Sequence, residues 1–274
     1  VGMNPYYEKD GMKRPLFFTG MHQPSDASQL QHCMISVNRL EHRKSDFVVN
    51  DWILDSGAFT RISSGQGHMP LRDYAAQIDR WSRCGNLLAA VAQDYMCEPF
   101  ILEITGLTVS EHQSMTTKNY KRLRKIVQSA YIMPVLQGFT PQDYVAHIGQ
   151  YGEWLTQGMW VGVGSVCKRN GSPREIEAVL AAIKEVRPDL RLHGFGIKRT
   201  ALAFQQVSEG FYSTDSMAWS YAARRQGRDG NGPGEAIAYS NAIATQPVQH
   251  DLGLRLAQEV LDLYIEGTTN GHAG

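Results

Sequence analysis

The sequence predicts an α/β protein folded as a (β/α)8 barrel, and three observations lead to this prediction. Short apolar runs alternate with longer segments of helical periodicity along the 274 residues. Eight such runs occur, which matches the eight parallel strands of the barrel. No linker rich in Pro or Ser and no internal repeat divides the chain, so we expect a single domain over residues 1–274.

The predicted strands are the apolar runs at 16–19, 34–37, 52–55, 88–94, 133–137, 161–164, 191–195 and 211–214. Strands that alternate with helices form parallel sheets, because each connection must return the chain to the same edge. The number of strands does not prove closure, and a doubly wound open sheet is the alternative to the barrel.

Helices are expected between these strands, where apolar residues recur with a period of 3.6. One helix follows Pro70 and carries Tyr74, Ile78 and Trp81 on one face. Another has an apolar stripe made of Ile176, Val179, Leu180, Ile183 and Val186. Ser172-Pro173 with Glu175 predicts a capping box at its start, and Thr140-Pro141 opens the preceding helix in the same way.

The domain is expected to have two parts. Residues 15–225 hold the catalytic strands and loops, and residues 226–267 form a C-terminal lid with a closing helix. Leu252, Leu256, Val260 and Leu263 predict that helix, and the tail from Gly267 is expected to fray.

Composition and charge exclude several classes of protein. Lys plus Arg equals Asp plus Glu at 27 each, so the chain lacks the overall positive charge of a protein that coats nucleic acid. The four cysteines form no CxxC pair, which argues against a zinc ribbon or a disulfide framework and favours the cytoplasm. No apolar run approaches the roughly 20 residues that cross a bilayer, so no membrane contact is expected.

Polar residues end most of the predicted strands. They are Asp55-Ser56-Gly57, Gln93-Asp94, Gln137-Gly138, Gly164-Ser165, His193-Gly194 and Thr214-Asp215-Ser216. Each taken alone is explained by turn formation or helix capping. Together they predict an active site, because the carboxyl ends of barrel strands meet on one face.

Three carboxylates, Asp55, Asp94 and Asp215, are expected to share this site with the amide of Gln137. Two carboxylates beside an anomeric carbon suit glycosyl transfer, since one attacks or stabilises while the other moves protons. An amide with an acid also suits the edge of a purine, whose ring Phe59 and His193 are candidates to sandwich. Phe59 is equally well explained as a core residue.

Three motifs resemble those of tRNA-guanine transglycosylases: Asp55-Ser56-Gly57-Ala58-Phe59, Val135-Leu136-Gln137-Gly138 and Tyr212-Ser213-Thr214-Asp215. The chain is more similar to the DNA 7-deazaguanine transglycosylases, the DpdA family of phages and bacterial gene clusters. Its supporting motifs run from Gln93 to Pro99, Gly164 to Arg169, Leu192 to Lys198 and Asp215 to Ser220. The resemblance covers residues 17–225, most of the chain.

The resemblance implies a transferase that replaces guanine in DNA by a 7-deazaguanine, specifically 7-cyano-7-deazaguanine, in phage or bacterial defence or anti-restriction. Asp215 would be the nucleophile that forms a covalent glycosyl intermediate, and Asp55 the general acid/base. The base would be held by Ser56, Phe59, Asp94, Gln137, Gly138, Gly164 and His193. His193 stands where the tRNA enzymes usually have methionine.

One departure from the tRNA enzymes concerns zinc. They carry a C-terminal CxCxxC…H site, whereas this chain has no cysteine after Cys167. We therefore expect a barrel of the tRNA-guanine transglycosylase type without the zinc subdomain, and no metal or other cofactor. A tRNA-directed exchange, a glycosidase acting on a nucleoside or sugar, and a non-catalytic nucleic-acid-binding barrel are the alternatives.

Local basic groups are expected to bind the phosphates of DNA despite the zero net charge. The pairs Lys168-Arg169, Lys198-Arg199 and Arg224-Arg225 each follow a strand-end motif, and Lys168, Arg169, Lys198 and Arg224 are the phosphate candidates. Lys118, Lys121, Arg122 and Lys125 share one helix face, which is equally well explained as a solvated surface. Helper proteins and oligomeric state are left open by the sequence.

Overall fold

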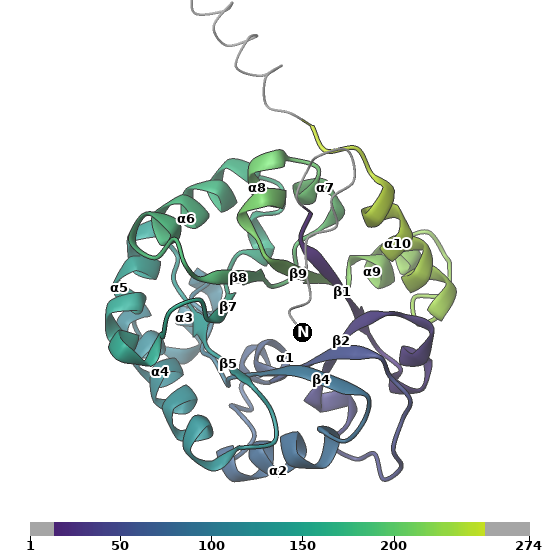
Figure 1. Ribbon diagram of the computed structural model, residues 1–274, viewed down its shortest axis with the longest axis horizontal. Coiled ribbons are helices and arrows are strands. Elements are labelled where there is room, and N and C mark those ends of the chain that lie inside the picture. Colours follow the sequence, from purple (N-terminus) through teal and green to yellow (C-terminus); the bar gives the residue numbers. More distant parts are fainter. Residues whose placement is uncertain (1–13, 250–274) are drawn as a thin grey trace, which may run out of the picture.

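Nine parallel strands form one sheet in the computed structural model, which describes residues 14–249. They are β1 (Leu16–Met21), β2 (His32–Ser36), β3 (Asp51–Asp55), β4 (Asn86–Val91), β5 (Ile132–Met133), β6 (Val135–Leu136), β7 (Trp160–Val163), β8 (Arg191–Gly194) and β9 (Ser213–Ser216). Their order is β5-β4-β3-β2-β1-β9-β8-β7-β6. Viewed down the barrel, the strands form a ring inside a ring of helices (Figure 1).

Pro134 explains why nine strands appear where the sequence predicts eight. The predicted strand 133–137 is divided at this residue into β5, which pairs with β4, and β6, which pairs with β7. A proline has no N–H to donate to a sheet, but its carbonyl still accepts a hydrogen bond from Gly162 N at 2.8 Å. The two ends of the sheet are thus consecutive in the chain, which supports the predicted barrel over the open sheet.

Ten α-helices are described: α1 (Ala58–Ser63), α2 (Leu71–Trp81), α3 (Pro99–Thr105), α4 (Val109–Ile126), α5 (Pro141–Tyr151), α6 (Pro173–Val186), α7 (Arg199–Leu202), α8 (Gln205–Gly210), α9 (Ala218–Arg225) and α10 (Pro233–Thr245). Four 3-10 helices complete the set: η1 (Pro24–Gln29), η2 (Val37–Arg39), η3 (Gly152–Trp154) and η4 (Cys167–Arg169). The connections from β1 to β2 and from β2 to β3 contain only η1 and η2. The regular alternation of strand and α-helix therefore begins at β3.

The predicted helix faces and caps are largely confirmed. Tyr74, Ile78 and Trp81 are buried on α2, and Thr140 forms a capping box with Asp143 at the start of α5. Two predicted details of the start of α6 are wrong. Ser172 makes no side-chain capping bond, and Glu175 instead lies 3.6 Å from the guanidinium of Arg169.

Val186 marks the end of the predicted α6 stripe, and it is exposed. The other four members of that stripe are buried against the barrel. Val186 is the last residue of the helix, where the chain turns away toward β8.

Inward-facing side chains fill the barrel. Phe18, Met34, Ile53, Val91, Met133, Val135 and Trp160 form one buried cluster inside the ring of strands. A larger cluster packs the outer faces of the strands against the helices. The barrel interior is therefore a packed core, as is usual for this fold, and it supports the groups at the strand ends.

Two strand boundaries differ from the prediction in a way that concerns the polar residues. The predicted strand 88–94 ends at Val91, so Gln93 and Asp94 lie in the following loop. The predicted strand 211–214 instead spans Ser213–Ser216, which includes Asp215. Asp215 pairs in register with Phe18 of β1, so hydrogen bonds along the sheet extend this strand beyond its apolar residues.

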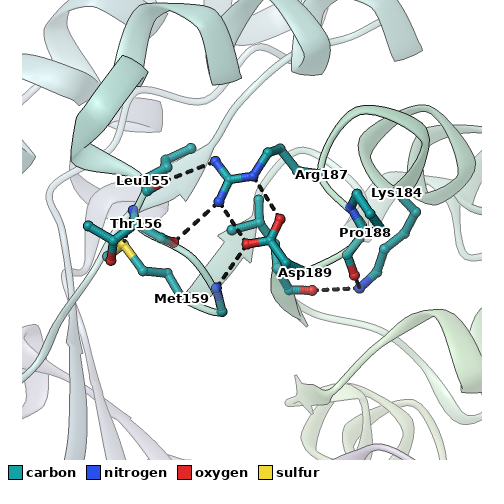
Figure 2. Close-up of polar contacts among 9 residues, drawn as sticks. Leu155, Thr156, Met159, Lys184, Arg187, Pro188 and Asp189 are labelled. Atoms are coloured by element: carbon teal, nitrogen blue, oxygen red, sulfur yellow. Dashed lines mark hydrogen bonds and ion pairs between the residues drawn. The ribbon is translucent and has the colours of Figure 1, made fainter.

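Arg187 and Asp189 join two loops at the amino ends of β7 and β8 (Figure 2). The guanidinium makes two 2.8 Å bonds to the Asp189 carboxylate and also donates to the carbonyl of Leu155 at 2.9 Å. Gly158 N donates to the same carboxylate. These bonds, with the Arg187 charge, lower the pKa of Asp189 and fix the loops at the end of the barrel away from the polar strand ends.

α10 packs against β1 and α9. Arg14 donates to the carbonyl of Ile243 at 3.2 Å. The predicted closing helix over Leu252 to Leu263 lies outside the described residues, and the predicted domain bounds stay a prediction. Within residues 14–249 no helix has the length and apolarity needed to cross a membrane.

Candidate active site

Three carboxylates lie at the carboxyl ends of the strands. Asp55 is the last residue of β3, Asp94 follows β4, and Asp215 lies in β9. Their negative charges act on one another: the charge of Asp215 raises the pKa of Asp55, and the charge of Asp55 raises the pKa of Asp94. The predicted gathering of these groups is thus observed, although the strands that carry them are far apart in the sequence.

Asp55 is held by the turn that follows it. Gly57, at φ 70°, donates from its N–H to Oδ2 of Asp55 at 3.0 Å. The side chain of Ser36 makes a second hydrogen bond to the Asp55 carboxylate. Burial nevertheless raises the pKa of Asp55 to about 6, and the charge of Asp215 adds to this effect. A carboxyl group with this pKa can both give and take a proton near neutral pH.

Asp94 begins a buried polar chain that passes through Gln137 to Ser165 and Glu98. Gln137 donates from Nε2 to Asp94 at 2.5 Å, and its Oε1 lies 2.7 Å from Oγ of Ser165. Ser165 Oγ also lies 2.8 Å from Glu98 and accepts from Cys97 N at 2.9 Å. Burial raises the pKa of Asp94 to about 7, with added repulsion from Asp55 and Glu98. These contacts orient the Gln137 amide with its N–H toward Asp94.

Two residues to which the sequence pattern assigns no individual role take part in this chain. Ser165 has φ 55°, and it is the one non-glycine residue with positive φ among residues 14–249. Such strain is held where the surrounding contacts require it. Glu98 is 3% exposed and contacts Ser165. Both lie inside the motifs on which the family resemblance rests, and that was the available signal.

The backbone of Gln137 is fixed by two further buried groups. Gln113 donates from Nε2 to the carbonyl of Gln137 at 2.8 Å, while Gln137 N donates to Nδ1 of His147 at 2.8 Å. Burial lowers the pKa of His147 to about 4, so its ring is neutral and accepts this bond. Neither Gln113 nor His147 follows a strand, so nothing in the local sequence pattern marked them.

Gly164 provides space for the Gln137 side chain. A Cβ at this position would lie 2.1 Å from Nε2 of Gln137. Both polar groups of Gly164 are already paired, because its N–H donates to Leu136 O at 2.9 Å and its carbonyl accepts from the Tyr144 hydroxyl at 2.7 Å. The expected contact between its backbone and the base stays a prediction.

We expect Gly164→Ala to displace the Gln137 amide and break its bond to Asp94. Overpacking of this kind costs about 1–3 kcal/mol, so the protein should still fold with a lower melting temperature. Affinity for a purine base should fall by about tenfold or more, as measured by calorimetry. Gly149→Ala on α5, where a Cβ meets no atom within 4 Å, is the matched control. Unchanged base affinity in Gly164→Ala would contradict this account.

Asp215 is held from one side only. Its Oδ1 accepts from Gly196 N at 3.0 Å and lies 3.4 Å from Nε2 of His193. The latter contact is not a hydrogen bond, and among residues 14–249 Nε2 has no hydrogen-bond partner. Ala218 N at the start of α9 bonds instead to Ser216 Oγ. Asp215 therefore does not cap α9, which removes the simplest structural explanation for this carboxylate.

The proton position on His193 follows from its neighbours. Trp160 Nε1, which can only donate, donates a hydrogen bond to Ser213 Oγ at 2.8 Å. Ser213 Oγ lies 2.9 Å from Nδ1 of His193. If the Ser213 hydroxyl donates to Nδ1, the neutral ring carries its proton on Nε2, facing the carboxylate. The other neutral tautomer would direct a lone pair at Asp215, which is electrostatically unfavourable.

His193 is completely buried, and the rings of Phe18, Trp160 and Phe195 surround it. This position below Asp215 leaves no exposed face for a base. The stacking role expected of His193 stays a prediction, which the burial does not favour.

Ser56 and Gly138, both expected to hold the base, are placed beside the polar chain. Ser56 is buried, with Oγ 3.5 Å from Oδ1 of Asp94. At Gly138 a Cβ would lie 2.6 Å from the Cβ of Asp143, so the α5 turn excludes a side chain there. The local structure thus explains why a serine and a glycine stand at these two positions. Their contacts to a base stay a prediction.

The rim of the barrel mixes rings and cations. Phe59 is 44% exposed, and Lys168 Nζ lies 5.4 Å from the centre of its ring. Arg169 stacks over Phe139 and contacts Glu175, so its charge is partly engaged. Lys198 and Arg224 are exposed. Lys168 and Arg169 lie in η4, which follows β7. Lys198 precedes α7, after β8, and Arg224 lies near the end of α9, after β9.

A cavity of about 680 Å³ lies at the other end of the barrel. Leu16, Leu88, Tyr131, Trp160 and Tyr212, near the amino ends of their strands, line it. It is therefore separate from the carboxylates. The part of the chain described by the structure has no group of three or more His, Cys, Asp or Glu placed to bind a metal ion.

The fold and the site define a parallel α/β barrel protein whose polar site is built from carboxylates at the strand ends. The model of the DpdA family, DeoxyPurine in DNA protein A, matches residues 12–241. The chain belongs to the DpdA family, which confirms the resemblance found in its motifs. Family membership implies an enzyme that modifies deoxypurines in DNA. A comparison with curated proteins found no match.

Proposed function

We propose that the protein exchanges guanine in DNA for a 7-deazaguanine, namely 7-cyano-7-deazaguanine, through a covalent intermediate on Asp215. The observation that carries this proposal is the pairing of two unlike carboxyl groups. Asp215 has one oxygen held by Gly196 N, while Asp55 has a pKa raised to about 6. Two carboxyl groups in different environments are what displacement at an anomeric carbon requires.

In the first step Oδ2 of Asp215 attacks C1′ of the deoxyribose. The bond from C1′ to the guanine nitrogen breaks, and the departing base receives its proton from Asp55. Oδ1 stays with Gly196 N and faces Nε2 of His193, so these two groups orient the carboxylate. Burial supports the proton transfer, because it keeps part of the Asp55 population protonated near neutral pH.

In the second step a nitrogen of the incoming 7-deazaguanine attacks C1′. Its proton passes to the Asp55 carboxylate, and the bond between C1′ and Asp215 breaks. Asp55 is thereby returned to its protonated form, and no net charge is gained or lost. Asp94 and the amide of Gln137 hold the edge of either base, as their buried contact supports. Phe59 stacks on the ring from the rim.

The test of this function is the exchange itself. Incubation with labelled guanine or 7-cyano-7-deazaguanine, followed by mass analysis of nucleosides from DNA, should show incorporation into DNA. Because extrusion of a base from a duplex costs a few kcal/mol, exchange should be faster on single-stranded DNA. Label that enters tRNA but never DNA would overturn the proposal in favour of the tRNA reaction.

We expect Ser213→Ala to slow adduct formation by about tenfold, equivalent to about 1.4 kcal/mol, with little change in KM. Without the Ser213 hydroxyl, only the charge of Asp215 favours the His193 proton on Nε2, so the tautomer whose lone pair faces Asp215 becomes more populated. Ser213→Thr keeps the hydroxyl and should retain activity. In a His193→Phe background Ser213→Ala should have no further effect. Additive losses in single-turnover assays would show that Ser213 acts independently of His193.

A further inference from the structure

Basic side chains without an acidic partner gather where β1 and β2 end. His22 follows β1, Arg39 ends η2, and Arg224 lies on α9. Both arginines are exposed, and none of the ion pairs among residues 14–249 includes either of them. The sequence pattern points to Arg224 but to neither His22 nor Arg39.

His22 connects the two arginines. A guanidinium can only donate, so Arg39 Nη2 donates to Nδ1 of His22 over 3.0 Å. The ring proton is then on Nε2, which donates to Ser220 Oγ at 2.8 Å, and the Ser220 hydroxyl in turn donates to Gly230 O at 2.6 Å. Arg224 lies one helical turn beyond Ser220 on α9.

The electrostatics of the group favour an anion. Burial, Arg39 and Arg224, in that order, lower the pKa of His22, so the ring stays neutral and keeps Nδ1 as an acceptor. Two unpaired guanidinium groups close to one imidazole repel each other and any added proton. A bound anion would relieve this repulsion, and a phosphate matches the fork geometry of arginine.

The group also lies between the loops of the two carboxylates. Asn38, next to Arg39, donates to Gly57 O at 3.2 Å, and Gly57 N holds Asp55. On the other side Trp219 of α9 donates to Gly20 O at 2.9 Å, and Gly20 lies on β1 two residues before His22. Strand β1 pairs with both β2 and β9. A ligand held here therefore adjoins the space between Asp55 and Asp215.

We propose that Arg39 and Arg224 bind a phosphodiester of the DNA strand beside the exchanged nucleotide, and that His22 positions Arg39 for this contact. The inference rests on the proposed function for the identity of the strand. It deepens that function by assigning the contact that fixes the sugar next to the carboxylates. A local site of this kind supplies phosphate affinity to a chain whose total charge is zero.

The test is the salt dependence of binding to a fluorescein-labelled single-stranded oligonucleotide that contains guanine, measured without an incoming base. Arg39→Ala and Arg224→Ala should each weaken binding and lower the slope of log K against log salt by about 0.7. Arg122→Ala, on the exposed face of α4, should leave both unchanged. A normal slope in Arg39→Ala, or an equal loss in Arg122→Ala, would place the strand elsewhere.

His22 is tested by a pair of variants. His22→Ala removes the acceptor that orients Arg39 and should weaken binding several-fold, whereas His22→Gln offers a side-chain oxygen to Arg39 and should restore part of the affinity. If His22→Ala binds as the parent does, the positioning role is wrong. Inorganic phosphate that competes at the concentration of the oligonucleotide would instead indicate a site for the free ion.

Failure of this site and failure of the proposed function give different results. Binding without an incoming base requires no chemistry. If Arg39→Ala weakens binding and lowers the salt slope as expected, but the parent protein exchanges no base into DNA, only the proposed function is wrong. Exchange into DNA that proceeds with a normal slope in Arg39→Ala would remove this phosphate site and leave the exchange reaction intact.

Discussion

Replacing Asp215 by Asn is expected to abolish the denaturation-resistant protein–DNA adduct and to lower the exchange rate by about 10⁴-fold or more. An amide is a far poorer nucleophile toward C1′ than a carboxylate. The replacement is nearly isosteric, and its side-chain oxygen can still accept from Gly196 N. The loss should therefore be chemical, with the melting temperature close to that of the parent.

Trapping on a denaturing gel, with each variant beside the parent, measures this effect. Asp73→Asn is the matched control, because Asp73 is an exposed carboxylate in the first turn of α2. If the Asp215→Asn protein still forms the adduct, the nucleophile assignment is wrong and Asp55 becomes the candidate.

Replacing Asp55 by Asn is expected to slow adduct formation and its resolution by about 10²–10⁴-fold, without preventing attack by Asp215. The pH dependence separates proton transfer from a structural effect. The pKa of Asp55 is raised by burial to about 6, so the carboxyl is protonated below that pH and ionised above it. Adduct formation, which needs the proton, should fall by about tenfold per pH unit above 6.

Resolution by the incoming base needs the ionised form and should rise with pH up to about 6, then level off. The Asp55→Asn protein should lose both trends. Asp94 titrates nearby, at about 7, so Asp94→Asn serves as the control that retains the Asp55 trend. Rapid-quench measurements between pH 5 and 8 that give parent and Asp55→Asn the same profile would exclude Asp55 as the proton donor.

Much of the fold could be predicted because the relevant signals are local. An apolar run predicts a strand, and apolar residues with a period of 3.6 together with a capping residue predict a helix, as at Thr140. Boundaries were less accurate where tertiary pairing decides them. Pro134 divides a predicted strand because a proline lacks an N–H, and β9 continues through Asp215 because β1 pairs with it.

The site was predictable in part for the same reason. Asp55 and Asp94 follow strands, and the barrel brings all strand ends to one face. Ser165 and Glu98 were given no role because their importance arises from contacts in three dimensions: Ser165 contacts Gln137 across 28 residues and Glu98 across 67 residues. Patterns along the chain contain no information on such pairings.

By itself the sequence determined the strand and helix succession, the gathering of Asp55, Asp94 and Asp215 at one face, and the family motifs that carry them. Only the tertiary structure decided which groups surround each carboxylate. The contact of His193 with Asp215, and the contact of His22 with Ser220 across 198 residues, depend on side chains meeting in three dimensions. The physical reason is that residue type sets which bonds a group can make, whereas its pKa and proton positions depend on the burial and charges around it.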